Sequence, residues 1–115
     1  MKKLKLIINN DKRNFTKNTF FVKKEMQTIL NLYAKMVSSG QWKDYGLSIG
    51  PKEVSFDFYQ RSSDKPVYKI LKNFSPKHDN EKFLLKDKNG FIIERSSNLN
   101  LLIKKRNWLK LKTVG

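Results

Sequence analysis

The sequence predicts an α+β fold, with one antiparallel sheet of about five to six strands and two helices packed on it, in the order β-α-β-β-β-β-β-α-β. Three observations predict this fold. Apolar side chains recur at helical spacing between residues 22 and 37, and again between 99 and 103. They alternate with polar side chains from residue 53 to 59, as in a strand. Finally, Asn89-Gly90 lies between two apolar runs, which is typical of a β-hairpin.

The chain begins with a predicted strand over residues 3–8, where Leu4, Leu6 and Ile8 alternate with lysines. Residues 9–18 are polar and basic, and they predict a mobile loop that leads into the main helix. Because no domain boundary or repeat interrupts the sequence, residues 1–115 are predicted to form a single domain.

The main helix is predicted to have an apolar face and a solvent-exposed face. The apolar stripe is expected to contain Val22, Met26, Ile29, Leu30, Tyr33, Met36 and Val37. The solvent-exposed face is expected to contain Lys23, Lys24, Gln27, Asn31 and Lys35. Val22 stands at the N-cap, where it offers no oxygen, so Glu25 is expected to reach back to a free backbone N–H. Gly40 is the expected left-handed stop.

Trp42-Lys43-Asp44-Tyr45 forms a compact aromatic corner directly after this helix. Two large aromatic residues at this spacing favour a loop that is anchored to the core over an exposed binding surface. Asp44 is expected to accept hydrogen bonds from nearby backbone amides.

Strands are predicted for the rest of the chain up to a second helix. They cover residues 47–49, 54–59, 67–72, 83–85 and 91–93, with Pro66 opening the third of them. Ser96 or Ser97 is predicted to cap a helix with an apolar stripe of Leu99, Leu102 and Ile103, ending at Asn107. A short final strand is predicted over residues 108–112.

Two blocks of the sequence resemble a known family. Residues 30–45 carry Met-Val-x-x-Gly-x-Trp-x-Asp-Tyr, and residues 59–72 carry an Arg...Pro-x-Tyr-x-Ile segment that includes Pro66 and Tyr68. These blocks, about a quarter of the chain, are similar to the signature of a family of small alphaproteobacterial proteins known as a domain of unknown function. Val22 stands where members of that family tend to have an aspartate N-cap, and Gln60 and Lys69 stand where they tend to have arginine. The resemblance implies one domain, in which Trp42, Asp44, Tyr45, Pro66 and Tyr68 have structural roles, and it implies no activity.

The net charge of +15 is concentrated at the two ends of the chain. Residues 1–24 carry eight basic groups and one acid, and residues 95–115 carry six basic groups and no acid. This distribution predicts non-specific binding of RNA or DNA, because cationic side chains attract phosphate and release its counterions. The residues expected to make these contacts are Lys2, Lys3, Lys5, Lys104, Lys105, Arg106, Lys110 and Lys112.

Other interpretations of the charge stay open. Lysine supplies 21 of the 25 basic residues, as AT-rich coding sequence would produce without any polyanion partner. The main alternative function is a protein-interaction or adaptor module, for which an exposed apolar patch at the Trp42–Tyr45 corner is expected. Peripheral binding to an anionic membrane is a third interpretation.

A smaller anion site is predicted at Arg61, Ser62, Ser63 and Lys69, where hydroxyls and turn amides beside an arginine could bind a phosphate or carboxylate. An ordinary polar turn is the alternative. The substitution of lysine for the family's arginine at position 69 weakens the anion-site hypothesis, because lysine lacks a planar fork.

Catalysis and cofactor binding have little support in the sequence. There are no cysteines, and the single histidine, His78, lies in a polar stretch beside Asp79 and Glu81, so no metal site, cofactor or catalytic residue is predicted. The N-terminal apolar run is too short for a signal peptide, and no stretch approaches the roughly 20 apolar residues of a membrane span. These features favour a cytoplasmic protein. The sequence leaves its oligomeric state and pathway open.

Overall fold

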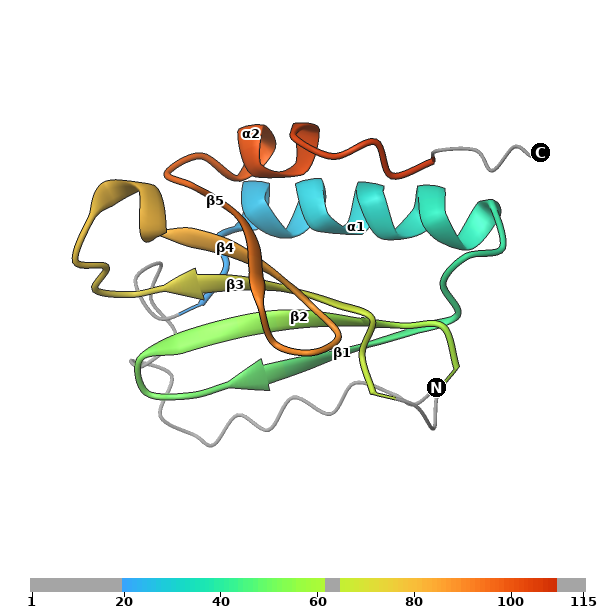
Figure 1. Ribbon diagram of the computed structural model, residues 1–115, viewed down its shortest axis with the longest axis horizontal. Helices are drawn as coiled ribbons and strands as arrows, with labels where there is room; N and C mark the ends of the chain where they lie inside the picture. The colour runs from blue at the N-terminus through green and yellow to red at the C-terminus, as the bar shows by residue number, and fades with distance from the viewer. Residues whose placement is uncertain (1–19, 62–64, 110–115) are drawn as a thin grey trace.

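The computed structural model describes residues 20–61 and 65–109 of the chain. Its elements are α1 (Lys23–Ser38), β1 (Asp44–Ile49), β2 (Glu53–Tyr59), β3 (Tyr68–Asn73), the 3₁₀ helix η2 (Asp79–Glu81), β4 (Phe83–Asp87), β5 (Ile92–Ser96) and α2 (Leu99–Lys104). The five strands form one antiparallel sheet in the order β1-β2-β3-β4-β5, so each strand pairs with its neighbour in the chain. Both helices lie on the same face of this sheet (Figure 1). The predicted α+β fold, with one antiparallel sheet and two helices, is confirmed.

Helix α1 begins and ends where the sequence predicts. Val22 is its N-cap, and the carboxylate of Glu25 accepts a hydrogen bond from the Val22 amide at 2.7 Å. Gly40 follows the helix with a φ of 82°, a left-handed conformation that glycine adopts without steric cost.

The predicted apolar stripe of α1 is partly wrong. Ile29, Leu32 and Met36 are its buried residues, whereas Leu30 and Val37 are 39% and 40% exposed. The buried face is centred on residues 29, 32 and 36, so positions 30 and 37 lie about 100° further around the helix. A pattern of apolar residues does not show which of two adjacent columns faces the sheet.

The core lies between the helices and the sheet. Val54, Phe56 and Phe58 of β2 are fully buried, as their alternation predicts. The alternation also predicts that the other face of β2 is exposed to solvent. This prediction is wrong, because Ser55 and Asp57 are also buried. The Asp57 carboxylate accepts hydrogen bonds from the hydroxyls of Ser48 at 2.9 Å and Ser55 at 2.7 Å, which compensate for its loss of water.

The β4–β5 hairpin has the predicted Asn-Gly turn. Gly90 has a φ of 88°, and the Asp87 carboxylate accepts hydrogen bonds from the amides of Asn89 and Phe91 at 2.9 and 3.0 Å. An irregularity in the pairing falls between Leu85 and Lys86. The Asp87 side chain thus stabilises the turn that connects the two strands.

Several predicted boundaries are wrong. Helix α2 ends at Lys104 and not at Asn107, because the chain leaves the helix at its C-cap Lys105. Strand β1 starts at Asp44, so half of the predicted aromatic corner belongs to the sheet. The cap of α2 is Asn98, which accepts a hydrogen bond from the Leu101 amide at 3.0 Å, because Ser96 is still paired with Phe83 in the sheet. Trp108 and Leu109 lie in a turn and not in a strand.

Some predictions fall on residues that the structure does not describe. These are the strand over residues 3–8, the loop over 9–18, the turn residues 62–64 and the part of the final strand beyond residue 109. Within residues 20–61 and 65–109, neither helix has the length and hydropathy that a membrane crossing requires.

Candidate functional site

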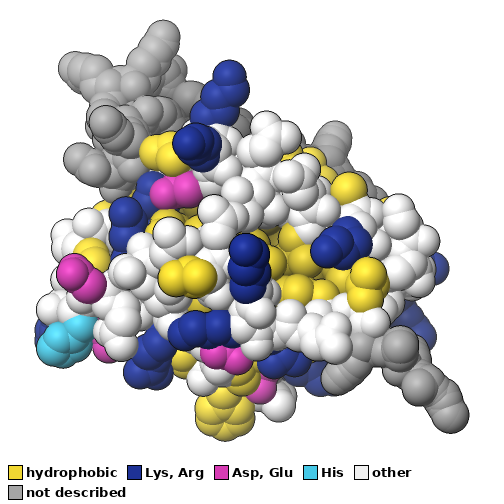
Figure 2. Space-filling view, turned by 90° about the horizontal axis from the view of Figure 1, so that it is seen from above, with side chains coloured by type: hydrophobic (Ala, Val, Ile, Leu, Met, Phe, Trp, Pro, Cys, Tyr) yellow, Lys and Arg dark blue, Asp and Glu magenta, His cyan; other side chains and the backbone are white. Residues whose placement is uncertain are grey.

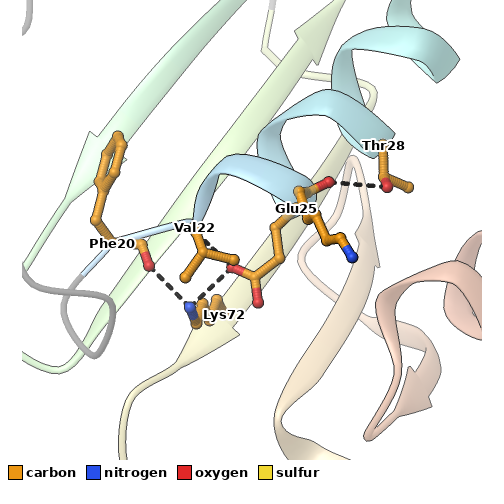
Figure 3. Close-up of polar contacts among 6 residues, drawn as sticks. Phe20, Val22, Glu25, Thr28 and Lys72 are labelled. Atoms are coloured by element: carbon orange, nitrogen blue, oxygen red, sulfur yellow. Dashed lines mark hydrogen bonds and ion pairs between the residues drawn. The ribbon is translucent and has the colours of Figure 1, made fainter.

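The start of α1 is held to the sheet by a buried ion pair between Lys72 of β3 and Glu25 (Figure 3). The Lys72 ammonium lies 2.8 Å from Glu25 Oε1 and also donates a hydrogen bond to the Phe20 carbonyl at 2.8 Å. The side chains of Lys72 and Glu25 are only 5% and 15% exposed. Lys72 is therefore a structural cation and does not belong to a binding surface.

The sequence analysis missed this pair, although a signal was present. Lys72 follows Tyr68 and Ile70 at a spacing of two residues, so all three side chains point to the same face of β3. Ile70 is fully buried, which places Lys72 on the core face, where it needs an acidic partner.

The surface charge is strongly asymmetric. Of the eight acidic residues in the described chain, Glu53 and Asp79 are exposed, Asp44 and Asp57 are buried, and the others, Glu25, Glu81, Asp87 and Glu94, are half-buried. Thirteen basic residues are exposed: Lys23, Lys24, Lys35, Lys43, Lys52, Arg61, Lys65, Lys77, Lys82, Lys88, Arg95, Lys104 and Lys105. On the helical face, Lys and Arg side chains are spread between hydrophobic ones, with few acidic groups among them (Figure 2).

The predicted nucleic-acid contacts are only partly described. Lys2, Lys3, Lys5, Lys110 and Lys112 lie outside the described residues. Lys104 and Lys105 are exposed at the end of α2, and the Lys105 ammonium donates a hydrogen bond to the Arg95 carbonyl at 2.8 Å. Arg106 differs from both, because it is half-buried.

The predicted anion site at Arg61 and Lys69 is also only partly described, because Ser62 and Ser63 lie outside the described residues. Arg61 is exposed just beyond β2. Lys69 is half-buried in β3, where its register partners are Asp57 of β2 and Lys86 of β4. This site stays a prediction.

A groove lies between the first turns of α1 and the start of α2. It consists of two adjoining hollows of about 270 and 330 Å³, which share Lys24, Thr28 and Asn100. Lys23 lines the second hollow and Lys82 the first. Gln27, Ser97 and Asn98 add amide and hydroxyl groups, and the first hollow is also lined by Val22, Phe83, Leu99 and Glu25. The Glu25 carboxylate is paired with Lys72, so the three ammonium groups beside neutral hydrogen-bonding groups remain suited to an anionic ligand. The sequence did not predict this groove, because its residues come from three distant segments.

A separate, third hollow of about 200 Å³ has Arg106 in its lining. The guanidinium lies 5.3 Å from the ring centroid of Tyr68 and 5.5 Å from that of Trp108, and it donates a hydrogen bond to the Tyr68 hydroxyl at 3.1 Å. The Trp108 indole N–H donates to the Ile103 carbonyl at 2.9 Å, which fixes the ring. Met36, Gln41 and Asn107 complete the lining.

The aromatic residues of the predicted corner belong to the core beside this hollow. Trp42 is 2% exposed and stacks on Phe58 with a centroid distance of 4.1 Å. It also contacts the ring of Trp108 at 5.6 Å, edge to face. The Asp44 carboxylate accepts a hydrogen bond from the Tyr45 amide at 2.9 Å. This corner therefore offers no exposed tryptophan to a partner.

Two tyrosines of the described chain have a raised pKa. Burial raises the pKa of Tyr33 and of Tyr59, and nearby carboxylates, Asp44 for the first and Asp57 for the second, raise it further. Within the described ranges, no three His, Asp or Glu residues gather where they could hold a metal ion. His78 is exposed.

Comparison with known proteins gives one match. The model of a family described as a protein of unknown function (DUF2794) matches residues 19–103, which extend from the entry of α1 almost to the end of α2. The chain belongs to this family. No curated protein and no solved structure matches. The DUF2794 match contains the ion pair of Lys72 and Glu25 and ends before Arg106.

Proposed function

We propose that this DUF2794 protein binds RNA or DNA through the phosphate backbone, without reading the base sequence. The observation that supports the proposal is the contrast between thirteen exposed basic residues and two exposed acidic ones in the described chain. Such a surface attracts a polyanion and gains free energy by releasing its counterions.

The kind of basic residue favours backbone contacts over base recognition. Lysine, which predominates on this surface, neutralises phosphate as a point charge but lacks the planar fork that binds guanine through two hydrogen bonds. The groove with Lys23, Lys24 and Lys82 is a suitable place for such contacts, because its amides and hydroxyls can bind phosphate or sugar oxygens.

The test is fluorescence anisotropy of the full chain with labelled RNA and duplex DNA of several sequences, at about 50 and about 200 mM salt. Contact with six or more phosphates should weaken binding by roughly a thousandfold over this range, with little dependence on sequence. The triple variant Lys23→Gln/Lys24→Gln/Lys82→Gln should reduce the slope of log affinity against log salt by about 2 to 3, roughly one per lost contact.

A matched control changes the same charge elsewhere on the surface. Lys43→Gln/Lys52→Gln/Lys77→Gln removes three exposed lysines that do not line the groove. If both triple variants lost the same affinity, the proposal of nucleic-acid binding would stand, but the groove would not be the centre of the binding surface. Absence of binding at about 50 mM salt would refute the proposal.

A second candidate is a protein-interaction module. The observation that favours it is the tip of the β4–β5 hairpin, where Phe91 is 66% exposed beside Ile92 at 41%. A partner that docks there should lose affinity in Phe91→Ser, and its binding should depend little on salt. This response would distinguish an apolar interface from polyanion binding.

A further inference from the structure

We propose that the hollow around Arg106 binds a terminal phosphate group, a phosphomonoester at the end of a nucleic-acid strand or free phosphate. The proposal deepens the proposed function and, for the strand end, rests on it. The Arg106 hollow would then distinguish a terminal phosphate from the phosphodiesters of the backbone, which the exposed lysines do not.

The electrostatic state of Arg106 supports this assignment. Within the described chain no carboxylate pairs with its guanidinium, which is nevertheless half-buried beside the rings of Tyr68 and Trp108. The ring faces and the Tyr68 hydroxyl satisfy only part of a group with five N–H donors. A half-buried guanidinium that still has N–H groups without an acceptor is preorganised to bind an oxyanion.

The end of α1 does not supply the missing negative charge. The helix C-terminus is close to this hollow, because Met36 and Gln41 line it. However, the last carbonyls are already bound by backbone amides, including Gln41 N to Met36 O at 3.0 Å and Gly40 N to Val37 O at 2.9 Å. The partial charge that remains at a capped helix end is smaller than the full charge of an anion.

The size and the lining of the hollow also suit a phosphate group. A volume of about 200 Å³ accommodates a phosphate together with several waters. The amide side chains of Gln41 and Asn107 join the guanidinium in the lining, so potential donors come from two separate segments of the chain. A phosphomonoester, with three terminal oxygens and about two negative charges, uses such donors better than a bridging phosphodiester does.

The strand-end experiment uses anisotropy with one single-stranded oligonucleotide labelled at its 3′ end, carrying either a 5′-phosphate or a 5′-hydroxyl. The 5′-phosphate should tighten binding about tenfold, as expected of one charge-assisted hydrogen-bonded pair. Arg106→Gln should abolish this difference, and Arg106→Lys should abolish most of it. The control Lys104→Gln removes an exposed charge two residues away and should preserve the difference.

The variant Asn107→Asp tests the same site without altering Arg106, in case the arginine variants fold poorly. Asn107 is exposed, so the aspartate adds a negative charge to the hollow without disturbing the stacked rings, and the 5′-phosphate preference should disappear. Equal affinity of the two oligonucleotides for the unaltered protein would overturn the strand-end proposal while leaving non-specific binding in place.

If neither oligonucleotide binds, the proposed function fails. A separate titration then tests whether the Arg106 hollow binds free phosphate. Tryptophan fluorescence of the full chain is followed during addition of inorganic phosphate, with chloride at matched ionic strength as the control. A saturable change that is lost in Arg106→Gln and in Trp108→Phe would support a site for free phosphate. Absence of such a change would overturn the site altogether.

Discussion

Removal of either partner of the buried ion pair should destabilise the fold strongly. Lys72→Met deletes an ammonium that is 5% exposed and leaves the Glu25 carboxylate and the Phe20 carbonyl without it. Loss of one member of a buried pair typically costs about 3–5 kcal/mol. We expect about 3 kcal/mol for Lys72→Met, because Glu25 keeps its hydrogen bond from the Val22 amide and retains some contact with water.

Glu25→Gln should cost about 2 kcal/mol, since the glutamine oxygen can still accept from the Val22 amide but the Lys72 charge loses its counter-charge. The double variant should lose less than the sum of the two, with a coupling energy of about 2 kcal/mol, because two neutral side chains no longer leave a buried charge behind.

Urea unfolding monitored by circular dichroism measures these free energies. Lys43→Met and Glu53→Gln are exposed controls and should change the free energy of unfolding by less than about 0.5 kcal/mol. A loss below about 1 kcal/mol for Lys72→Met, or strict additivity in the double variant, would refute the assignment of this pair as the anchor of α1.

Three further predictions concern local structure and pH. Val22→Thr should raise the free energy of unfolding by about 1 kcal/mol in urea titrations, because it supplies the cap oxygen that valine lacks at nearly the same size; no gain would contradict this. Gly90→Ala should lower it by about 1 kcal/mol or more, since φ is 88° there, whereas Gly50→Ala, at a position without positive φ, should cost less; equal losses would contradict the turn geometry. Folding raises the pKa of Tyr33 and Tyr59 above 10.0, so their contribution to stability is complete below pH 10 and is lost as the pH rises through their folded-state pKa. Unfolding free energies between pH 8 and 11 should therefore fall less steeply in Tyr33→Phe and Tyr59→Phe, and an unchanged slope would contradict the linkage.

The features that could be predicted from the sequence are those fixed by neighbours in the chain. Asn89-Gly90 determines its own turn, and Glu25 can reach the Val22 amide because it lies one helical turn away. Alternation in β2 identified the core face, since Val54, Phe56 and Phe58 have no polar residue among them on that side. Local geometry is sufficient for each of these inferences.

The features that could not be predicted depend on contacts across the sheet. Leu32 and not Leu30 faces the core because of the rotation of α1 against the strands, which no local pattern sets. Asp57 is buried because two serines from different strands supply hydroxyl donors to it. Arg106 was predicted only as one cation among many, and its hydrogen bond to the Tyr68 hydroxyl joins residues 38 positions apart.

A coding bias toward lysine would explain part of the composition but not the arrangement of the charges. It would replace arginine by lysine at tolerant positions, yet it would not bury acidic groups such as Asp44 and Asp57. Under such a bias, a position that carries arginine is informative. Among the three arginines in the described chain, Arg61 and Arg95 are exposed. Arg106 alone is half-buried, where its guanidinium lies near the rings of Tyr68 and Trp108 and has five N–H donors, against the three of a lysine ammonium. This position is where lysine would be the poorest substitute, and it is where the protein should distinguish one phosphate from another.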